Sequence, residues 1–231
     1  QFRMSYSTGF RAPQSFDADL HIAFAGGGVS MIKLADDLKE ERSKSLSASF
    51  NYDKATPHYV YGFTFEGFFT SLDDAFFQDP VGENEFGEIF VKRNGSGAVV
   101  KGLSLDFRCN FDQKLQFESG LTLQQSLYHE GVNYSDMLPA KREFLRTPGK
   151  YGYATINYLP SKRIDVSINL VHTGRMELVH LAGSPNQVID EYKTSETFNV
   201  MGLKATYIQR VNQIGVTIGY SLGVKNLLNS Y

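Results

Sequence analysis

The 231-residue sequence predicts an all-β fold: an antiparallel up-and-down transmembrane β-barrel fragment, of about nine strands, that forms an open curved sheet. Three observations lead to this prediction. Apolar and polar residues alternate along most of the chain, tight and long connections alternate strictly, and aromatic residues recur beside the tight connections. We find no long segment that keeps the period of an α-helix.

The first observation is a period of two, which places apolar and polar side chains on opposite faces of a strand. In 103-LSLDFRCNF-111, for example, Leu103 and Phe107 face one side and Asp106 and Arg108 the other. The same pattern predicts crossings at 1–6, 43–53, 58–70, 98–111, 114–128, 150–159, 163–173, 197–209 and 212–226. Strands in this number are too few to enclose a wide wet interior, so we expect two unpaired edges.

The second observation concerns the connections. Tight ones are expected at 53–57, 112–114, 159–163 and 210–213, and long polar ones at 7–42, 71–97, 129–149 and 174–196. A β-sandwich has no reason to gather every long connection at one end, whereas an up-and-down membrane barrel does. The strand-like residues 86–93 fall inside a long connection, and we expect them to extend the strand wall beyond the membrane without an extra crossing.

The third observation is a set of aromatic residues that share the apolar face and lie near the tight connections. The set comprises Tyr52, Tyr59, Phe111, Tyr158 and Tyr207. Amphipathic rings prefer the membrane interface, so the set predicts a girdle and an apolar face turned to lipid. The polar row would then line a wet interior. Burial of Leu103, Phe107, Leu121 and Val216 under a second protein layer would contradict this orientation.

Composition excludes several classes. The net charge of −2 argues against a nucleic-acid partner. Cys109 is the single cysteine, which excludes an internal disulfide framework. No apolar run is long enough for a transmembrane helix. The N-terminal QFRMSYSTGF lacks a signal-peptide pattern and reads like a strand, so we expect a fragment of a longer protein.

No enzymatic constellation is visible, and we predict neither an enzyme nor a metal site. The glycine-rich 94-NGSG-97 lacks the pattern of a nucleophile elbow or a phosphate loop, and 26-GGG-28 is expected at a loop tip. The histidines have no paired metal spacing; they are His21, His58, His129, His172 and His180. An acidic run lacks the calcium-loop pattern, so we interpret it as a solvated segment at the base of a loop; it comprises Asp36, Asp37, Glu40 and Glu41.

Three motifs resemble those of TonB-dependent outer-membrane receptors. Phe10, Arg11, Ala12 and Pro13 match the Phe-Arg-Ala-Pro motif that ends a strand in that family, and Asp37, Leu38, Lys39 and Glu41 match part of the motif that announces the next strand. Near the C-terminus, Asn226, Leu227, Asn229 and Tyr231 match the Asn-Leu-Phe-Asn-x-Tyr signature of the penultimate strand. Ala35-Asp36 and Glu40 depart from the usual Asn-Pro and Pro.

The resemblance implies a barrel of about 22 strands in the bacterial outer membrane, plugged by an N-terminal domain. Residues 1–231 would be the C-terminal part of that barrel, with the plug domain and the final strand outside the chain. The implied function is uptake of a scarce nutrient complex, with energy from TonB delivered through the plug. The implied partners are outer-membrane lipid and a small-molecule or metal-complex ligand at the extracellular loops.

The resemblance leaves the ligand open among iron–siderophore, haem and cobalamin, of which an iron complex is preferred. Haem is considered as a transported ligand and not as a resident cofactor. His21 lies between the first two motifs, where haem receptors of this family carry an iron-ligating histidine, so it is the candidate ligand-binding residue. Arg11 is expected to anchor the loop base. Two alternatives remain: a soluble β-rich binding module, such as a glycan-binding sandwich, and an outer-membrane enzyme.

Overall fold

The computed structural model describes residues 1–14, 31–84, 87–135, 137–183 and 187–230. The main sheet contains β1 (Phe2–Arg11), β3 (Glu41–Ala55), β4 (Tyr59–Asp73), β7 (Ala98–Phe111), β8 (Leu115–Val132), β10 (Lys150–Ser161), β11 (Ile164–Thr173), β14 (Phe198–Val211) and β15 (Val216–Val224). Smaller elements at one end are β2 (Met31–Leu34), β5 (Phe76–Asn84), β6 (Gly87–Asn94), β9 (Lys141–Glu143), β12 (Glu177–His180) and β13 (Glu191–Thr194). None of the described residues forms a helix that is long and apolar enough to span a membrane.

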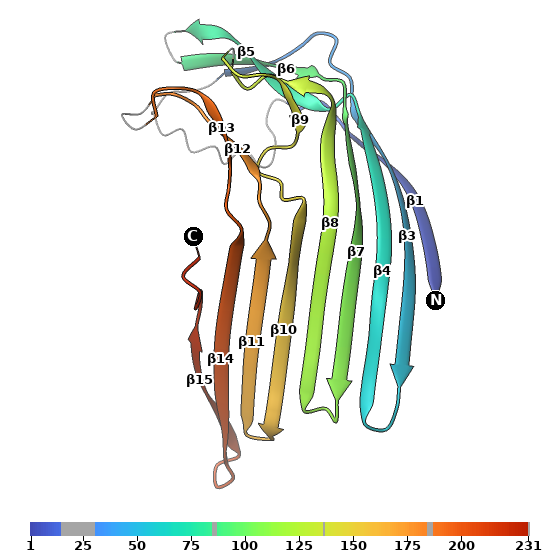
Figure 1. Cartoon of the computed structure of the whole chain (residues 1–231), viewed down its shortest axis with the longest axis vertical. Helices are drawn as coiled ribbons and strands as arrows, with labels where there is room; N and C mark the ends of the chain where they lie inside the picture. Colours follow the sequence, from blue (N-terminus) through green and yellow to red (C-terminus); the bar gives the residue numbers. More distant parts are fainter. Residues whose placement is uncertain (15–30, 85–86, 136, 184–186, 231) are drawn as a thin grey trace.

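The main sheet is an antiparallel meander in which each strand pairs with the next one along the path. Its order is β1-β3-β4-β7-β8-β10-β11-β14-β15, with β9 attached to β8. Figure 1 shows the curvature of this sheet, and β1 and β15 form its two edges. The predicted open curved sheet is therefore confirmed, and a strand of the main sheet lies at each range where a crossing was predicted.

Strand pairing places the apolar and polar side chains on separate faces. Leu105 lies between Phe65 of β4 and Leu121 of β8, and the next residue, Asp106, lies between Thr64 and Gly120. Directly paired residues point to the same face, so apolar rows join across strands, as polar rows do. A slip of one residue in any pairing would exchange the faces, and the pattern therefore fixes the register.

Among the residues that the structure describes, none forms a second layer over the apolar face. The exposed fractions of Leu103, Phe107, Leu121 and Val216 are 49%, 38%, 40% and 45%. Within the described part of the chain, the buried hydrophobic set consists of Ala98 alone. A soluble sheet would bury such a row against a second layer, because monomeric soluble proteins rarely expose apolar patches of this extent.

The two ends of the sheet differ, as Figure 1 shows: tight turns lie at the lower end and long connections at the upper end. At the β7–β8 turn, Asp112 and Gln113 adopt positive φ angles of 49° and 56°, and Asn110 Oδ1 accepts the Gln113 N–H at 3.0 Å. We call the end that carries the long connections the loop end. The predicted alternation of tight and long connections is confirmed.

The prediction for residues 86–93 was only partly correct. The described residues of this range, 87–93, add no strand to the main sheet, but they do not extend its wall either: β6 pairs antiparallel with β5 and parallel with β2 in a separate three-stranded sheet. The physical reason lies at Gly97, whose φ is +87° and whose added Cβ would lie 2.1 Å from the Leu72 carbonyl oxygen. The chain bends at this glycine before it joins the main sheet at Ala98.

Candidate ligand site at the loop end

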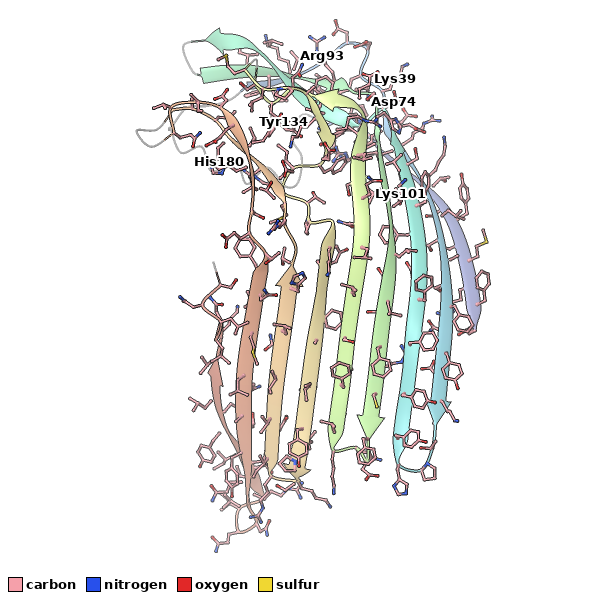
Figure 2. The ribbon with its side chains drawn as sticks, viewed as in Figure 1. Lys39, Asp74, Arg93, Lys101, Tyr134 and His180 are labelled. Atoms are coloured by element: carbon pink, nitrogen blue, oxygen red, sulfur yellow. The ribbon has the colours of Figure 1, made fainter. Side chains whose placement is uncertain are left out.

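An aromatic cavity lies where the loop end meets the polar face of the sheet. Its volume is about 700 Å³, and its lining includes Phe76, Phe77, Tyr128, Glu130 and Tyr134. Tyr128 and Glu130 continue the polar row of β8 by the alternation of that strand. Figure 2 shows Tyr134 at the loop end. The cavity is thus adjacent to the polar side of the sheet and not to its apolar side.

The junction of β7 and β8 holds one wall of this cavity. Nδ1 of His129 lies 2.7 Å from the Ser96 carbonyl oxygen and donates to it, and the His129 backbone N–H donates to Gly97 O at 3.0 Å. Ser96 Oγ accepts the Glu130 N–H at 3.1 Å. These bonds tie the end of β8 to the start of β7 and place the Glu130 carboxylate at the cavity.

Tyr134 is a half-buried member of the aromatic lining. Its ring meets that of Tyr192 edge-on, with centroids 6.5 Å apart and planes at 90°. Burial raises the pKa of the Tyr134 phenol, and the neighbouring Tyr128 and Tyr192 raise it further. The phenol is therefore protonated at neutral pH and hydrogen-bonds to Tyr128 within the cavity lining.

The β12–β13 hairpin is held against the β8–β10 connection by polar contacts. Lys141 pairs with Glu177, and its Nζ lies 4.4 Å from the centroid of the Tyr192 ring. Thr194 Oγ1 donates to Glu177 Oε1 at 2.6 Å. The Lys141 ammonium and then the Thr194 hydroxyl hold the pKa of Glu177 below its usual value. Two long connections therefore form one continuous wall.

A further pair reinforces the same wall. Ser135 Oγ donates to Asp190 Oδ2, and the Ala182 backbone N–H donates to Asp190 Oδ1 at 2.7 Å. The pKa of Asp190 is lowered mainly by the backbone N–H of Ala182 and, to a smaller extent, by the Ser135 hydroxyl. The Tyr192 hydroxyl donates to Pro139 O at 2.9 Å.

The first family-type motif lies at the base of the first long connection. Arg11 Nε lies 3.5 Å from Glu41 Oε1, and its guanidinium carbon lies 4.9 Å from the Phe76 ring centroid. These contacts agree with a role for Arg11 in anchoring the loop. Phe10 is 78% exposed, and Ala12 and Pro13 line a neighbouring groove of about 570 Å³.

The second motif is tied to the β4–β7 connection through Asn94. Its Oδ1 accepts the Lys39 N–H at 2.7 Å, and its Nδ2 donates to Lys39 O at 3.0 Å and to Asp74 O at 2.8 Å. Leu38 N–H donates to Ala35 O at 3.1 Å, which closes a turn that carries the exposed Asp37. These motif residues therefore organise the loop base.

The C-terminal motif closes the end of β15. Asn226 adopts φ +57°, and its amide exchanges two hydrogen bonds of 3.1 Å with the backbone of Ser230. Leu227 N–H donates to Met201 O at 2.8 Å, and Asn229 N–H donates to Asn226 O at 3.0 Å. Tyr231 lies outside the described residues.

The candidate ligand residue His21 also lies outside the described residues, so its role stays a prediction. Two other histidines have structural partners: His58 Nδ1 is 3.0 Å from Asp112 Oδ1, and His172 Nδ1 is 2.8 Å from Asn199 Oδ1. Over the described ranges, no three residues of the His, Cys, Asp or Glu types gather as a metal-binding group.

Sequence reasoning missed the aromatic cavity. Its lining comes from the β4–β7 connection and from the end of β8 with the connection that follows, and no local spacing joins these two segments. The available signal was the presence of aromatic residues inside otherwise polar connections, at 76–77 and at Tyr134 and Tyr192. That signal marks candidates for burial at the loop end, but it does not say which of them meet.

Comparison with protein families gives one match, to a family described as TonB dependent receptor-like, beta-barrel, over residues 1–227. No curated protein sequence matches the chain.

Solved structures share the fold at low sequence identity. The FrpB iron transporter from Neisseria meningitidis (F5-1 variant) has a TM-score of 0.65 and 18% identity, over 99% of this chain and 33% of that one. The siderophore receptor PirA from Acinetobacter baumannii has a TM-score of 0.63 and 16% identity, over 98% and 34%. The ferric-catecholate import receptor Fiu from E. coli K12 has a TM-score of 0.63 and 16% identity, over 99% and 29%. The chain thus spans about a third of the length of the structures that it matches.

Proposed function

Because the chain belongs to the TonB dependent receptor-like β-barrel family, we propose that it forms part of the barrel wall and ligand-gathering loops of a receptor in the bacterial outer membrane. The receptor takes up a scarce nutrient complex. Energy supplied by TonB acts through a plug domain outside the chain and releases the ligand inward. The chain itself contributes no enzymatic step.

One observation supports this function most strongly: the uncovered apolar face and the polar face belong to the same antiparallel sheet. In a bilayer the apolar face lies against lipid, and the polar face lines a water-filled lumen. The aromatic girdle set lies on the apolar face, with Tyr59 and Phe111 as direct register partners near the tight turns. The tight turns then lie on the periplasmic side and the loop end lies outside the cell.

An iron complex is the proposed ligand, and an iron–siderophore takes precedence over haem and cobalamin. The solved relatives are described as an iron transporter, a siderophore receptor and a ferric-catecholate import receptor. The aromatic cavity adds support, because flat rings such as those of a catecholate pack favourably against Tyr and Phe side chains.

The direct test is uptake of radiolabelled iron by cells that express the full-length receptor. We expect uptake of a ferric catecholate with the receptor, and loss of uptake but retention of surface binding in a strain without TonB. Uptake that is independent of TonB would contradict the energy source, and an absence of binding would contradict the ligand. Extraction of the protein into buffer without detergent would contradict the receptor and favour the soluble binding module.

A further inference from the structure

A groove lies on the apolar face of the sheet, below the loop end. Its volume is about 580 Å³, and its lining includes Leu46, Phe69, Leu103 and Leu123. Gly67 pairs with Ala48, and these two small neighbours deepen the groove beside Leu103, the other register partner of Gly67. A groove of this composition fits a hydrocarbon chain.

Two ammonium groups flank the loop-side part of this groove. Lys101 follows the same β7 row as Leu103 and pairs with Phe69 and Gln125, and Lys150 pairs with Leu123. Strand β8 alone separates the two lysines, which places their Cα atoms roughly 12 Å apart from the strand spacing and rise. Figure 2 shows Lys101 near the loop end of the sheet.

The height of Lys101 corresponds to a lipid headgroup. Ten residues separate it from Phe111 of the girdle set, or roughly 33 Å along the strand. A strand tilt of about 40° reduces this length to roughly 25 Å along the membrane normal, close to the thickness of the apolar band of such barrels. Lys101 therefore lies where the hydrocarbon of the outer leaflet ends.

The two lysines differ from Lys44, which lies on the same face. The Lys44 ammonium donates to Asp73 at 3.0 Å. In the part of the chain that the structure describes, the side chains of Lys101 and Lys150 have no hydrogen bond or ion pair, and both are exposed. Their charges are thus available to an anion beside the groove.

We propose that this groove is a binding site for a phosphorylated lipid of the outer leaflet, with an acyl chain along Leu103 and Leu123 and a phosphate between Lys101 and Lys150. The inference rests on the proposed function, because it needs the apolar face to lie in a membrane. Charge complementarity identifies the occupant: Lys101 at headgroup height, with Lys150 two register positions further from the loop end and beside the same apolar groove, matches an anionic lipid.

The test uses the purified full-length receptor in detergent and native mass spectrometry with lipid A that carries two phosphates. We expect Lys101→Gln with Lys150→Gln to weaken binding about 25-fold, since each basic residue near an anionic headgroup contributes roughly fivefold. Lys101→Arg with Lys150→Arg should retain the affinity. Lys204→Gln, a matched single control on the polar face opposite Ser167, should bind like the wild type.

The acyl-chain part is tested separately. A Cβ added at Gly67 would contact Leu103 Cδ2 at 3.4 Å, an ordinary van der Waals distance, so Gly67→Val fills the groove without a clash at Cβ. It should weaken lipid A binding although no charge changes.

Wild-type titrations keep the proposal falsifiable even where a variant fails to fold. Equal affinity for dephosphorylated lipid A would overturn the phosphate contact, and displacement of lipid A by an equal concentration of inorganic phosphate would overturn the lipid as occupant. Unchanged binding by the double Gln variant would overturn the site. Detergent partitioning and iron uptake of the receptor are measured independently. If the receptor inserts and transports iron but gives one of these outcomes, the lipid-site inference is refuted and the proposed function is not.

Discussion

Arg11 and Glu41 are register partners at the loop end of β1 and β3, with Arg11 Nε 3.5 Å from Glu41 Oε1. The second oxygen of Glu41 accepts the backbone N–H of Phe76 at 3.0 Å. The Glu41 side chain is only 14% exposed, whereas that of Arg11 is 48% exposed. The carboxylate therefore connects the base of the first long connection to β5, beside the aromatic cavity.

Replacement of Glu41 by Ala should loosen this connection. The Phe76 N–H would lose its acceptor, and an unsatisfied donor of this kind costs about 1–2 kcal/mol. Hydrogen exchange at the Phe76 amide should accelerate roughly 5- to 30-fold. Glu41→Gln keeps an acceptor oxygen and should accelerate exchange less. Equal rates in the wild type and the Ala variant would contradict the structural role of the carboxylate.

The contact between Glu177 and Lys141 should weaken in acid. The pKa of Glu177 is lowered in the folded protein, mainly by Lys141. The stabilisation is therefore present above the unfolded value of about 4.3 and is lost as the pH falls through the lower folded value. Because Glu177 is 30% exposed, we expect a loss of only about 1 kcal/mol.

Hydrogen exchange at Ser195 reports this contact, since its N–H donates to Met176 O at 2.8 Å next to Glu177. Protection at Ser195, corrected for intrinsic exchange, should fall between pH 6 and pH 3. Glu177→Gln should remove most of this pH dependence, and a variant that titrates like the wild type would show that another group is responsible.

The main sheet could be predicted because one physical constraint acts along every strand. A strand between lipid and water must alternate apolar and polar residues, so the period of two is readable in one segment at a time. Leu103 and Asp106 already indicate their faces without knowledge of their partners. Strand ends were less accurate: β1 continues to Arg11, beyond the expected residue 6, because its polar end pairs with β3 outside the apolar band.

The loop end could not be predicted in the same way. Strand β2 has four residues and pairs in parallel with β6, more than fifty residues further along the chain, and such a short segment carries no pattern that selects a partner. The contact between Tyr134 and Tyr192 likewise depends on how two connections meet. The motif at Arg11 and Glu41 indicated a loop base from family resemblance, but not its contact with Phe76.

The haem hypothesis predicts a specific effect at His21. If haem is the ligand, a neutral imidazole that ligates its iron would be lost in His21→Ala, and haem affinity should fall at least tenfold. Titration of the full-length receptor with haem, followed by the Soret band, measures this change. His180→Ala provides a control from another long connection, and equal affinity in wild type and His21→Ala would remove His21 as a ligand.

The aromatic cavity predicts that Tyr134 contributes through its ring and its hydroxyl. Tyr134→Ala should weaken ferric-catecholate binding about tenfold, because an aromatic pair contributes about 0.5–1.5 kcal/mol beyond its buried area. Tyr134→Phe isolates the hydroxyl and should lose less. Phe107→Ala, on the apolar face, serves as the control in an equilibrium binding assay. If this variant loses as much affinity as Tyr134→Ala, the cavity is not the binding site of the ligand.

Two adjacent residues of β8 test the orientation of the sheet. Leu121 pairs with Leu105 on the apolar face, and Thr122 pairs with Ser104 on the polar face, where their hydroxyls lie 2.9 Å apart. An arginine at Leu121 would face hydrocarbon and should lower the free energy of unfolding by about 2–4 kcal/mol, whereas an arginine at Thr122 would face the lumen and should cost about 1 kcal/mol or less. Reversible urea unfolding of the full-length receptor in lipid vesicles measures both values. A larger cost at Thr122 than at Leu121 would mean that the polar face, and not the apolar one, lies against the bilayer.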